Sequence, residues 1–136
     1  YNAIVWNPFS VESGTVDAPL ARSRKDRKKV GIDQSGRRAV THYRVLKNFK
    51  QFAHVECQLE TGRTHQIRVH MSSIGHPLLG DDVYGSGKSP YNITGQALHA
   101  RVLGFVHPRT GKYMEFEAPL PDYFQKILND LESNGR

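Results

Sequence analysis

The densest group of polar side chains that could do chemistry lies in residues 62–70, which read Gly-Arg-Thr-His-Gln-Ile-Arg-Val-His. Three apolar side chains in and after this segment recur at helical spacing: Ile67, Met71 and Ile74. This spacing predicts a helix over residues 64–74, with Thr64 as its N-cap and Gly75 as its stop. A strand is expected before it, and such a junction exposes backbone N–H groups at the positive end of the helix. We therefore expect the junction to favour bound anions such as phosphates.

Arg68 is the cation whose position in the predicted helix suits a binding role. At about 100° per residue it lies on the shoulder of the apolar stripe, half facing the interior. A guanidinium held there could present its rigid fork of donors to a carboxylate or phosphate that arrives from another element. The alternative is a solvated arginine in a surface ion pair, and the spacing alone leaves both open.

Histidines and acidic residues around this segment raise the question of a metal site. His65, His70 and His76 are close in sequence, but they lack the i, i+4 pair with an intervening Glu that zinc hydrolases use. No cluster of carboxylate or thiolate ligands accompanies them, so we expect no bound metal. The two carboxylates in residues 80–85, Gly-Asp-Asp-Val-Tyr-Gly, could bind a cation. A glycine-flanked turn packed by Tyr84 is the favoured interpretation.

Alternating and helical hydrophobic patterns predict the elements that carry these residues. Strands are expected over residues 1–6, 39–49, 53–60, 98–106 and 113–116, with a brief extended piece over 14–20. A second helix is expected over residues 122–131, and residues 75–96 are expected to be loop because they are rich in Gly, Pro, Asp and Ser. The sequence therefore predicts a single α+β unit, with a mixed, mainly antiparallel sheet and two main helices.

Composition excludes several classes of protein. The 136 residues are 38% hydrophobic and 24% charged, which suits one ordinary domain. No stretch approaches the roughly 20 consecutive apolar residues of a membrane span. The single cysteine, Cys57, alternates with apolar neighbours and is expected to be a core residue rather than a nucleophile. Because one cysteine cannot form an internal disulfide and no signal peptide is evident, we expect a cytoplasmic protein.

The net charge of +6 is concentrated in residues 22–29, Arg-Ser-Arg-Lys-Asp-Arg-Lys-Lys, here named the basic run. Its six cations and one anion account for five of the six net charges, and the segment is expected to form a long polar loop with residues 31–36. The cations are Arg22, Arg24, Lys25, Arg27, Lys28 and Lys29. They could contact RNA phosphates, or the run could be a solvated, flexible loop. No aromatic residue is interleaved, so any RNA contact would position the RNA rather than select its sequence.

The segment 59–70, continued by 75–78 and 80–85, resembles the signature of the RluA-type pseudouridine synthases. The resemblance extends along nearly the whole chain, through further segments: residues 1–5, 41–46, 96–100, 105–108 and 117–121. The basic run, residues 86–95 and the last few residues match loosely. The resemblance implies that the chain is the C-terminal part of a pseudouridine synthase catalytic domain. Such an isomerase converts chosen uridines in structured RNA, commonly large-subunit ribosomal RNA, to pseudouridine. It uses no cofactor and no metal.

Site residues follow from the resemblance position by position. Tyr1 would be the active-site tyrosine that stacks on the target base and helps to remove a ring proton. Arg68 would be the arginine that pairs with the catalytic aspartate. Ile67 would support the floor of the substrate pocket beside His65, and Arg63 would contact RNA. Such a pocket suits a base that has left its stack, and a carboxylate there needs a fixed cation to stay ionised.

One departure from the family pattern concerns the catalytic aspartate. In the family it lies in a His-Arg-Leu-Asp-x-x-Thr-Ser-Gly motif before the tyrosine strand, and this sequence contains no such motif. We therefore expect residues 1–136 to form a partial domain without synthase activity of its own. Two alternatives stay open: a non-catalytic RNA-binding module, and a phosphate-binding or metal-dependent hydrolase that uses His65, His70 and Asp81. The sequence leaves the oligomeric state and the modified uridine open.

Overall fold

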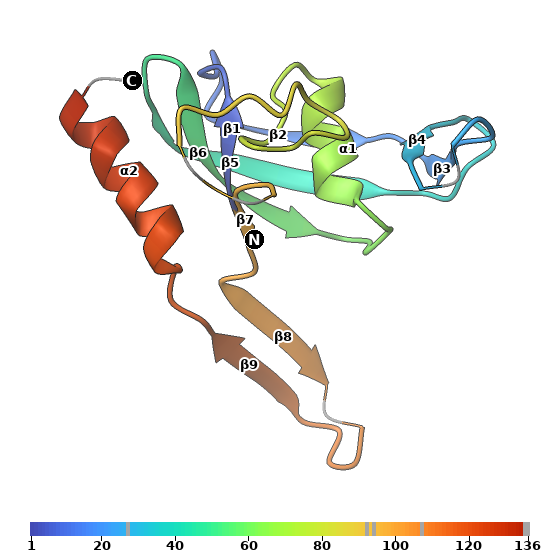
Figure 1. The fold of residues 1–136 in the computed structure, drawn as a ribbon. Helices are drawn as coiled ribbons and strands as arrows, with labels where there is room; N and C mark the ends of the chain where they lie inside the picture. Colours follow the sequence, from blue (N-terminus) through green and yellow to red (C-terminus); the bar gives the residue numbers. More distant parts are fainter. Residues whose placement is uncertain (27, 92, 94, 107, 135–136) are drawn as a thin grey trace.

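A five-stranded antiparallel sheet forms the centre of the computed structural model, which describes residues 1–26, 28–91, 93, 95–106 and 108–134. The strand order is β2-β5-β6-β1-β7 (Figure 1). The strands are β1 (Asn2–Trp6), β2 (Ser13–Asp17), β5 (Val40–Asn48), β6 (Phe52–Leu59) and β7 (Leu98–His99). Two further two-stranded sheets are hairpins, formed by β3 (Leu20–Arg22) with β4 (Val30–Ile32) and by β8 (Val102–Val106) with β9 (Tyr113–Glu117). The helices are α1 (Gln66–Ser73) and α2 (Asp122–Asn134), so the predicted α+β class is confirmed.

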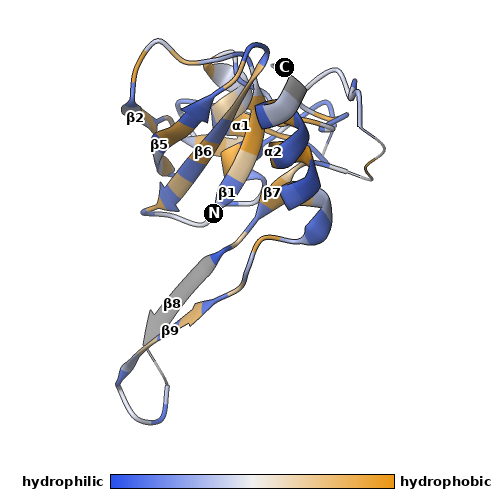
Figure 2. Cartoon of the chain, turned by 90° about the vertical axis from the view of Figure 1, so that its left-hand side faces the viewer, coloured by the Kyte–Doolittle hydropathy of each residue, from blue (hydrophilic) through white to orange (hydrophobic). Residues whose placement is uncertain are grey.

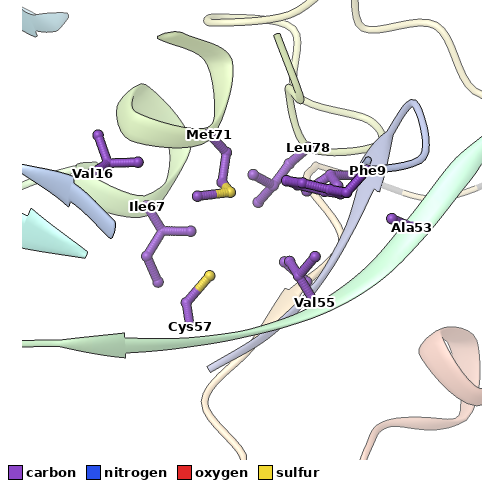
Figure 3. Close-up of a cluster of buried hydrophobic side chains, with 10 residues drawn as sticks. Phe9, Val16, Ala53, Val55, Cys57, Ile67, Met71 and Leu78 are labelled. Atoms are coloured by element: carbon purple, nitrogen blue, oxygen red, sulfur yellow. The ribbon is translucent and has the colours of Figure 1, made fainter. Parts of the chain in front are cut away.

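Strand β1 shows how the two helices cover opposite faces of the sheet. Successive side chains of a strand point to opposite faces, and Ala3 and Val5 join a different buried cluster from Ile4. The first cluster is closed by Ile67 and Met71 of α1, which point toward the β6 side chains of Val55 and Cys57 (Figure 3). The second cluster is closed by apolar side chains of α2: Phe124, Ile127, Leu128 and Leu131. Figure 2 shows α2 crossing in front of the sheet, with α1 behind it.

Cys57 is a core residue, as expected from its alternation with apolar neighbours. Its side chain is buried in the cluster under α1. Burial raises the pKa of its thiol to about 12. The thiol therefore stays protonated at neutral pH and is a poor nucleophile.

The expectation that the basic run lies in a long unstructured loop is wrong, because β3 and β4 pair at its two ends. Leu20 lies opposite Ile32, and Arg22 opposite Val30. Leu20 and Val30 are buried in a small cluster with Val69 of α1, and burying these two side chains stabilises a hairpin whose tip is polar. Figure 1 shows this hairpin at one end of the molecule, beside α1. Arg27 lies outside the described residues.

The ends of α1 agree with the prediction at one terminus only. Gly75 has a φ of 86°, and the next residue donates its N–H to Met71 O at 2.9 Å, so the glycine ends the helix as expected. Thr64 is not the N-cap. His65 takes that position in a left-handed conformation, with φ of 57° and no capping bond from its side chain. Gln66, described below, supplies a partner for the preceding backbone instead.

The hairpin of β8 and β9, which follows β7 and precedes α2 in the chain, extends away from the sheet (Figure 1). Residues 98–106 were expected to form one strand, and the structure divides them into β7 and β8. Among the described residues, no helix is long and apolar enough to cross a membrane.

Candidate active site

A cavity of about 300 Å³ opens where the start of β1 meets the start of α1. Its lining comprises Tyr1, Leu59, Arg63, His65, Gln66, Ile67, Arg68, Gln96 and Leu98. The structure thus brings together the residues that the family resemblance assigned to catalysis and to the substrate pocket: Tyr1, Arg68, Ile67 and His65. Arg63, which was assigned to RNA contact, lines the same cavity. Residues far apart in the sequence meet here because β1 lies between β6 and β7, and α1 packs on the face of the sheet beside them.

Tyr1 is fixed by its backbone and leaves its side chain available. Its amino group donates to Cys57 O at 2.9 Å, and its carbonyl accepts from Cys57 N at 2.8 Å. These two bonds continue the register of β1 on β6 and hold the Cα of Tyr1 at the cavity. The residue is 40% exposed, a high value for a large aromatic side chain. An aromatic face is therefore presented to a ligand on a rigid support.

Arg68 forms a two-pronged ion pair with Asp81, which follows α1 in the chain. Its Nε donates to Asp81 Oδ2 at 2.8 Å, and its Nη2 donates to Oδ1 at 3.0 Å. The Arg68 side chain is 11% exposed and that of Asp81 is 0% exposed, so the alternative of a solvated surface pair is wrong. The guanidinium also lies over the Tyr84 ring, 5.1 Å from its centroid. The hydrogen bond to Asp81 raises the pKa of Arg68 further above its usual value.

Asp81 is committed to this structural role. Burial alone would raise the pKa of its carboxyl group, but hydrogen bonds from Arg68 and from the N–H groups of Tyr84 and Val83 lower it overall. The two N–H donors lie 3.1 and 3.0 Å from Oδ1 and close a turn, which agrees with the favoured interpretation of residues 80–85. Among the described residues, no group of three His, Cys, Asp or Glu side chains could hold a metal ion. The metal-dependent hydrolase therefore gains no support.

Gln66 is a site residue that sequence reasoning missed. It is 2% exposed and its side-chain amide is fully occupied. Its Oε1 accepts from Thr61 Oγ1 at 2.7 Å and from Arg63 N at 3.0 Å, while its Nε2 donates to Val40 O and Thr41 Oγ1, both at 2.9 Å. The amide thus ties the first turn of α1 to β5. No signal for this role is present in the sequence, because Thr64 is a favoured N-cap by residue type and the partners of Gln66 lie far away in the chain, on β5.

His65 connects the cavity to the base of the β3–β4 hairpin. Its Nδ1 lies 2.7 Å from the Tyr84 hydroxyl, and that hydroxyl accepts from Val30 N at 2.9 Å. Burial and the neighbouring Arg68 charge lower the pKa of His65, so the ring is neutral at pH 7. Tyr84 thereby joins β4, α1 and the Arg68 guanidinium in one contact network.

We expect Tyr84→Phe to destabilise the protein by about 1–3 kcal/mol, because it leaves the buried N–H of Val30 without its partner. The ring and its contact with Arg68 are retained, so the loss reports the hydroxyl alone. Urea unfolding measures the stability, and amide hydrogen exchange should increase at Val30 in particular. Tyr113→Phe is the matched control, since the Tyr113 hydroxyl donates to Glu115, which is exposed. Equal stability of the two variants would contradict the role of Tyr84.

His70 anchors α1 on its buried side. Its Nδ1 lies 2.8 Å from Thr41 Oγ1 and its Nε2 lies 2.9 Å from Ala18 O, and the residue is 0% exposed. Burial lowers the pKa of His70 more than its hydrogen bond to Ala18 raises it. His70 is therefore a neutral structural residue, which removes it from the proposed hydrolase set.

The lowered pKa of His70 predicts acid sensitivity. The unfolded chain binds this proton near pH 6.5 and the folded chain only at lower pH, so stability is complete above about pH 6.5 and falls as the pH drops. His70→Gln should flatten the decline in unfolding free energy between pH 6.5 and 5, without abolishing it, because burial also lowers the pKa values of His54 and His65. Urea titrations at several pH values measure this. An unchanged pH slope would contradict it.

The described cations of the basic run lie exposed on the β3–β4 hairpin: Arg22, Arg24, Lys25, Lys28 and Lys29. Arg63 lines the cavity at Tyr1, and its Nε donates to Arg38 O at 2.9 Å. Among the described residues that line the cavity, none is Asp or Glu. The cavity can therefore receive and orient an aromatic ligand, but its lining offers no carboxylate for bond cleavage.

Comparison with known proteins gives consistent matches. Residues 1–73 match the sequence model of the family described as RNA pseudouridylate synthase. A Bacillus subtilis protein named as an uncharacterized RNA pseudouridine synthase is 55% identical over 99% of this chain and 44% of its own length. A Zymomonas mobilis protein named ribosomal large subunit pseudouridine synthase D is 50% identical over 100% of this chain and 45% of its own. The chain thus spans less than half of each of these relatives.

A solved structure agrees with the sequence matches. Human RNA pseudouridylate synthase domain containing 4 superposes with a TM-score of 0.73 at 27% sequence identity. The superposition covers 96% of this chain and 60% of that one. Nearly the whole chain therefore shares its fold with part of this solved protein.

Proposed function

The chain belongs to the RNA pseudouridylate synthase family, and on that premise we propose that it supplies the tyrosine and arginine side of a uridine-isomerising active site. The substrate would be a uridine in structured RNA, and large-subunit ribosomal RNA is the class named for the Zymomonas mobilis relative. The observation that carries the proposal is the cavity that Tyr1, Ile67 and Arg68 line together. Association with ribosomal RNA would place the protein in the cytoplasm.

The cavity's own residues suit a flipped uracil base. A base must leave its stack before its glycosidic bond can be reached, and aromatic and apolar side chains receive it. Tyr1 offers the aromatic face, and Ile67, which is 4% exposed, offers an apolar floor. A volume of about 300 Å³ is at the small end of ligand pockets, which suits one base rather than a larger ligand.

His65 is proposed to donate a hydrogen bond to a uracil carbonyl. The Tyr84 hydroxyl satisfies both of its neighbours when it accepts from Val30 and donates to Nδ1 of His65. The neutral ring then carries its proton on Nε2. Uracil presents carbonyl oxygens, so a fixed N–H donor in the cavity contributes to its recognition.

The catalytic carboxylate is proposed to come from a part of the protein outside residues 1–136. Asp81 cannot serve, since its side chain is fully buried and both oxygens are held by Arg68. The bonds to Asp81 use Nε and Nη2 of Arg68, and among the described residues none accepts from Nη1. Nη1 would bind a second carboxylate and keep it ionised at neutral pH. The two curated relatives are more than twice as long as the matched segment, so they have room for such a residue.

A chimaera tests this proposal. Residues 1–136 replace the matching segment of the Zymomonas mobilis relative, and RNA carrying tritium at carbon 5 of uracil is the substrate. Because the base is rejoined to ribose through that carbon, isomerisation releases the tritium. Release by the purified chimaera on ribosomal RNA is the expected result. A folded chimaera that binds this RNA and releases none would contradict the proposal and favour the non-catalytic RNA-binding module.

A further inference from the structure

A second and larger cavity, about 480 Å³, lies between the β3–β4 hairpin and the turn before α1. Its lining comprises Leu20, Ala21, Arg22, Val30, Ser35, Gly36, Arg37, Gly62, Arg63 and Thr64. Arg63 belongs to both linings, so this cavity adjoins the one at Tyr1. We name it the arginine cavity. Of the described cations in the basic run, only Arg22 lines it.

The charge of the arginine cavity is of one sign. Arg22, Arg37 and Arg63 line it, and among its described lining residues there is no Asp or Glu. Thr64 adds a hydroxyl group, which also donates to anions. The Ser35 hydroxyl donates to Asp33 Oδ1 at 2.7 Å and is therefore not among the donors for a ligand. Arginine presents a planar fork of donors that matches the oxygens of a phosphate. The chemistry of the lining therefore selects an anion of the phosphate class.

Two of the three arginines are carried by a rigid frame. The Arg63 guanidinium is oriented by its bond to Arg38 O at 2.9 Å, and its backbone N–H by Gln66 at 3.0 Å. The backbone of Arg37 exchanges two hydrogen bonds with Leu20, both of 2.8 Å. A Cβ on Gly36 would lie 2.5 Å from Leu20 O, so glycine is required for this close approach. The walls are thus built before any ligand arrives.

We propose that the arginine cavity binds a phosphodiester of the RNA strand whose uridine enters the cavity at Tyr1. The inference rests on the proposed function for the identity of the strand. The two cavities are adjacent because Arg63 lines both. A base and a nearby phosphate of one RNA strand are also adjacent, so one strand can occupy both cavities. Arginines held in the arginine cavity fix where along its length the RNA strand binds. The exposed cations at the tip of the β3–β4 hairpin attract the strand by charge but do not fix its position.

Gly62 offers a variant that fills the arginine cavity without disturbing the fold. A Cβ at this position meets no atom within 4 Å, and its φ is not among the positive values. Gly62→Val therefore narrows the cavity, while Arg37→Gln removes one of its charges. Lys50→Gln is the matched charge control, because Lys50 is exposed in the turn at the far end of β5. Circular dichroism and thermal unfolding verify that all three variants fold.

The test measures the association constant K of single-stranded pentauridylate RNA for the 136-residue chain. Fluorescence anisotropy of labelled RNA reports binding at a series of salt concentrations. We expect Arg37→Gln to reduce the slope of log K against log salt by about 0.7 more than Lys50→Gln does. Gly62→Val should weaken binding about tenfold, an effect of about 1.4 kcal/mol. Equal slopes for Arg37→Gln and Lys50→Gln, or unchanged affinity in Gly62→Val, would overturn the inference.

A second experiment distinguishes binding of RNA from binding of free phosphate. Together with the chimaera, it also distinguishes failure of this inference from failure of the proposed function. Inorganic phosphate should shift the NMR amide signals of residues 35–37 and 62–64, and pentauridylate should displace it. Phosphate that RNA fails to displace would overturn the assignment to RNA. If the chimaera releases no tritium while Arg37→Gln and Gly62→Val weaken RNA binding as expected, the phosphate site stands and the isomerase proposal fails. If the chimaera is active while both variants bind RNA as the parent chain does, the isomerase proposal stands and the phosphate site fails.

Discussion

Replacing Arg68 with alanine is expected to lower the free energy of unfolding by about 3–5 kcal/mol, the range for breaking a buried ion pair from one side. The variant leaves the carboxylate of Asp81 charged, fully buried and deprived of two hydrogen bonds. It also removes the cation over the Tyr84 ring. Urea unfolding at pH 7 measures the change. Arg68 would then contribute to stability in addition to its proposed part in the chemistry.

Two comparisons isolate the buried pair as the cause. Arg44→Ala breaks an exposed pair of 3.3 Å with Glu56 and should cost less than about 1 kcal/mol. The double variant Arg68→Ala with Asp81→Asn removes the stranded charge and should recover part of the loss. If Arg68→Ala costs no more than Arg44→Ala, the pair does not hold α1 to the loop of residues 80–85.

Changes at Tyr1 are expected to have the largest effect on catalysis. In the Zymomonas mobilis chimaera, Tyr1→Phe keeps the aromatic face but removes the hydroxyl proposed to help with proton removal. Tritium release should fall by about 10²–10⁴-fold, the range for one acid–base group, with little change in RNA affinity. Tyr1→Ala should in addition weaken binding by about 1–3 kcal/mol, the value of one base stacked on an aromatic ring.

Tyr113→Phe in the same chimaera is the control for these rates, because Tyr113 lies on the β8–β9 hairpin and is 64% exposed. Its rate of tritium release should equal that of the parent chimaera. A Tyr1→Phe chimaera that is as fast as this control would remove the hydroxyl from the mechanism. Stacking alone would then be the role of Tyr1.

The elements around the cavity could be predicted because their patterns are local. The stripe of Ile67, Met71 and Ile74 predicted α1, and Gly75 predicted its end. The stripe was wrong in its last member, because Ile74 follows the helix and is 37% exposed. The alternation along residues 39–49 and 53–60 predicted β5 and β6. Each of these signals depends on residues within one turn or one strand, where hydrophobic spacing reports the structure directly.

The features that sequence reasoning missed depend on distant partners. The β3–β4 hairpin is stabilised by the burial of Leu20 and Val30 under α1, which the intervening cations conceal. The helix start was assigned to Thr64 by its residue type, but Gln66 takes over because β5 offers it partners at Val40 and Thr41. Spacing placed Arg68 correctly on the helix shoulder. Its partner Asp81 was not predicted, because Asp81 lies 13 residues further along the chain, beyond the reach of helical spacing.

The central claim is that residues 1–136 hold the tyrosine and arginine of the active site while the catalytic carboxylate lies elsewhere in the protein. The measurement that tests it most directly is tritium release from uridine-labelled ribosomal RNA, assayed side by side for the purified 136-residue chain and the chimaera. We predict release by the chimaera and none above the protein-free background by the chain alone. Tritium release by the isolated chain would contradict the claim, because a carboxylate within residues 1–136 would then be doing the chemistry.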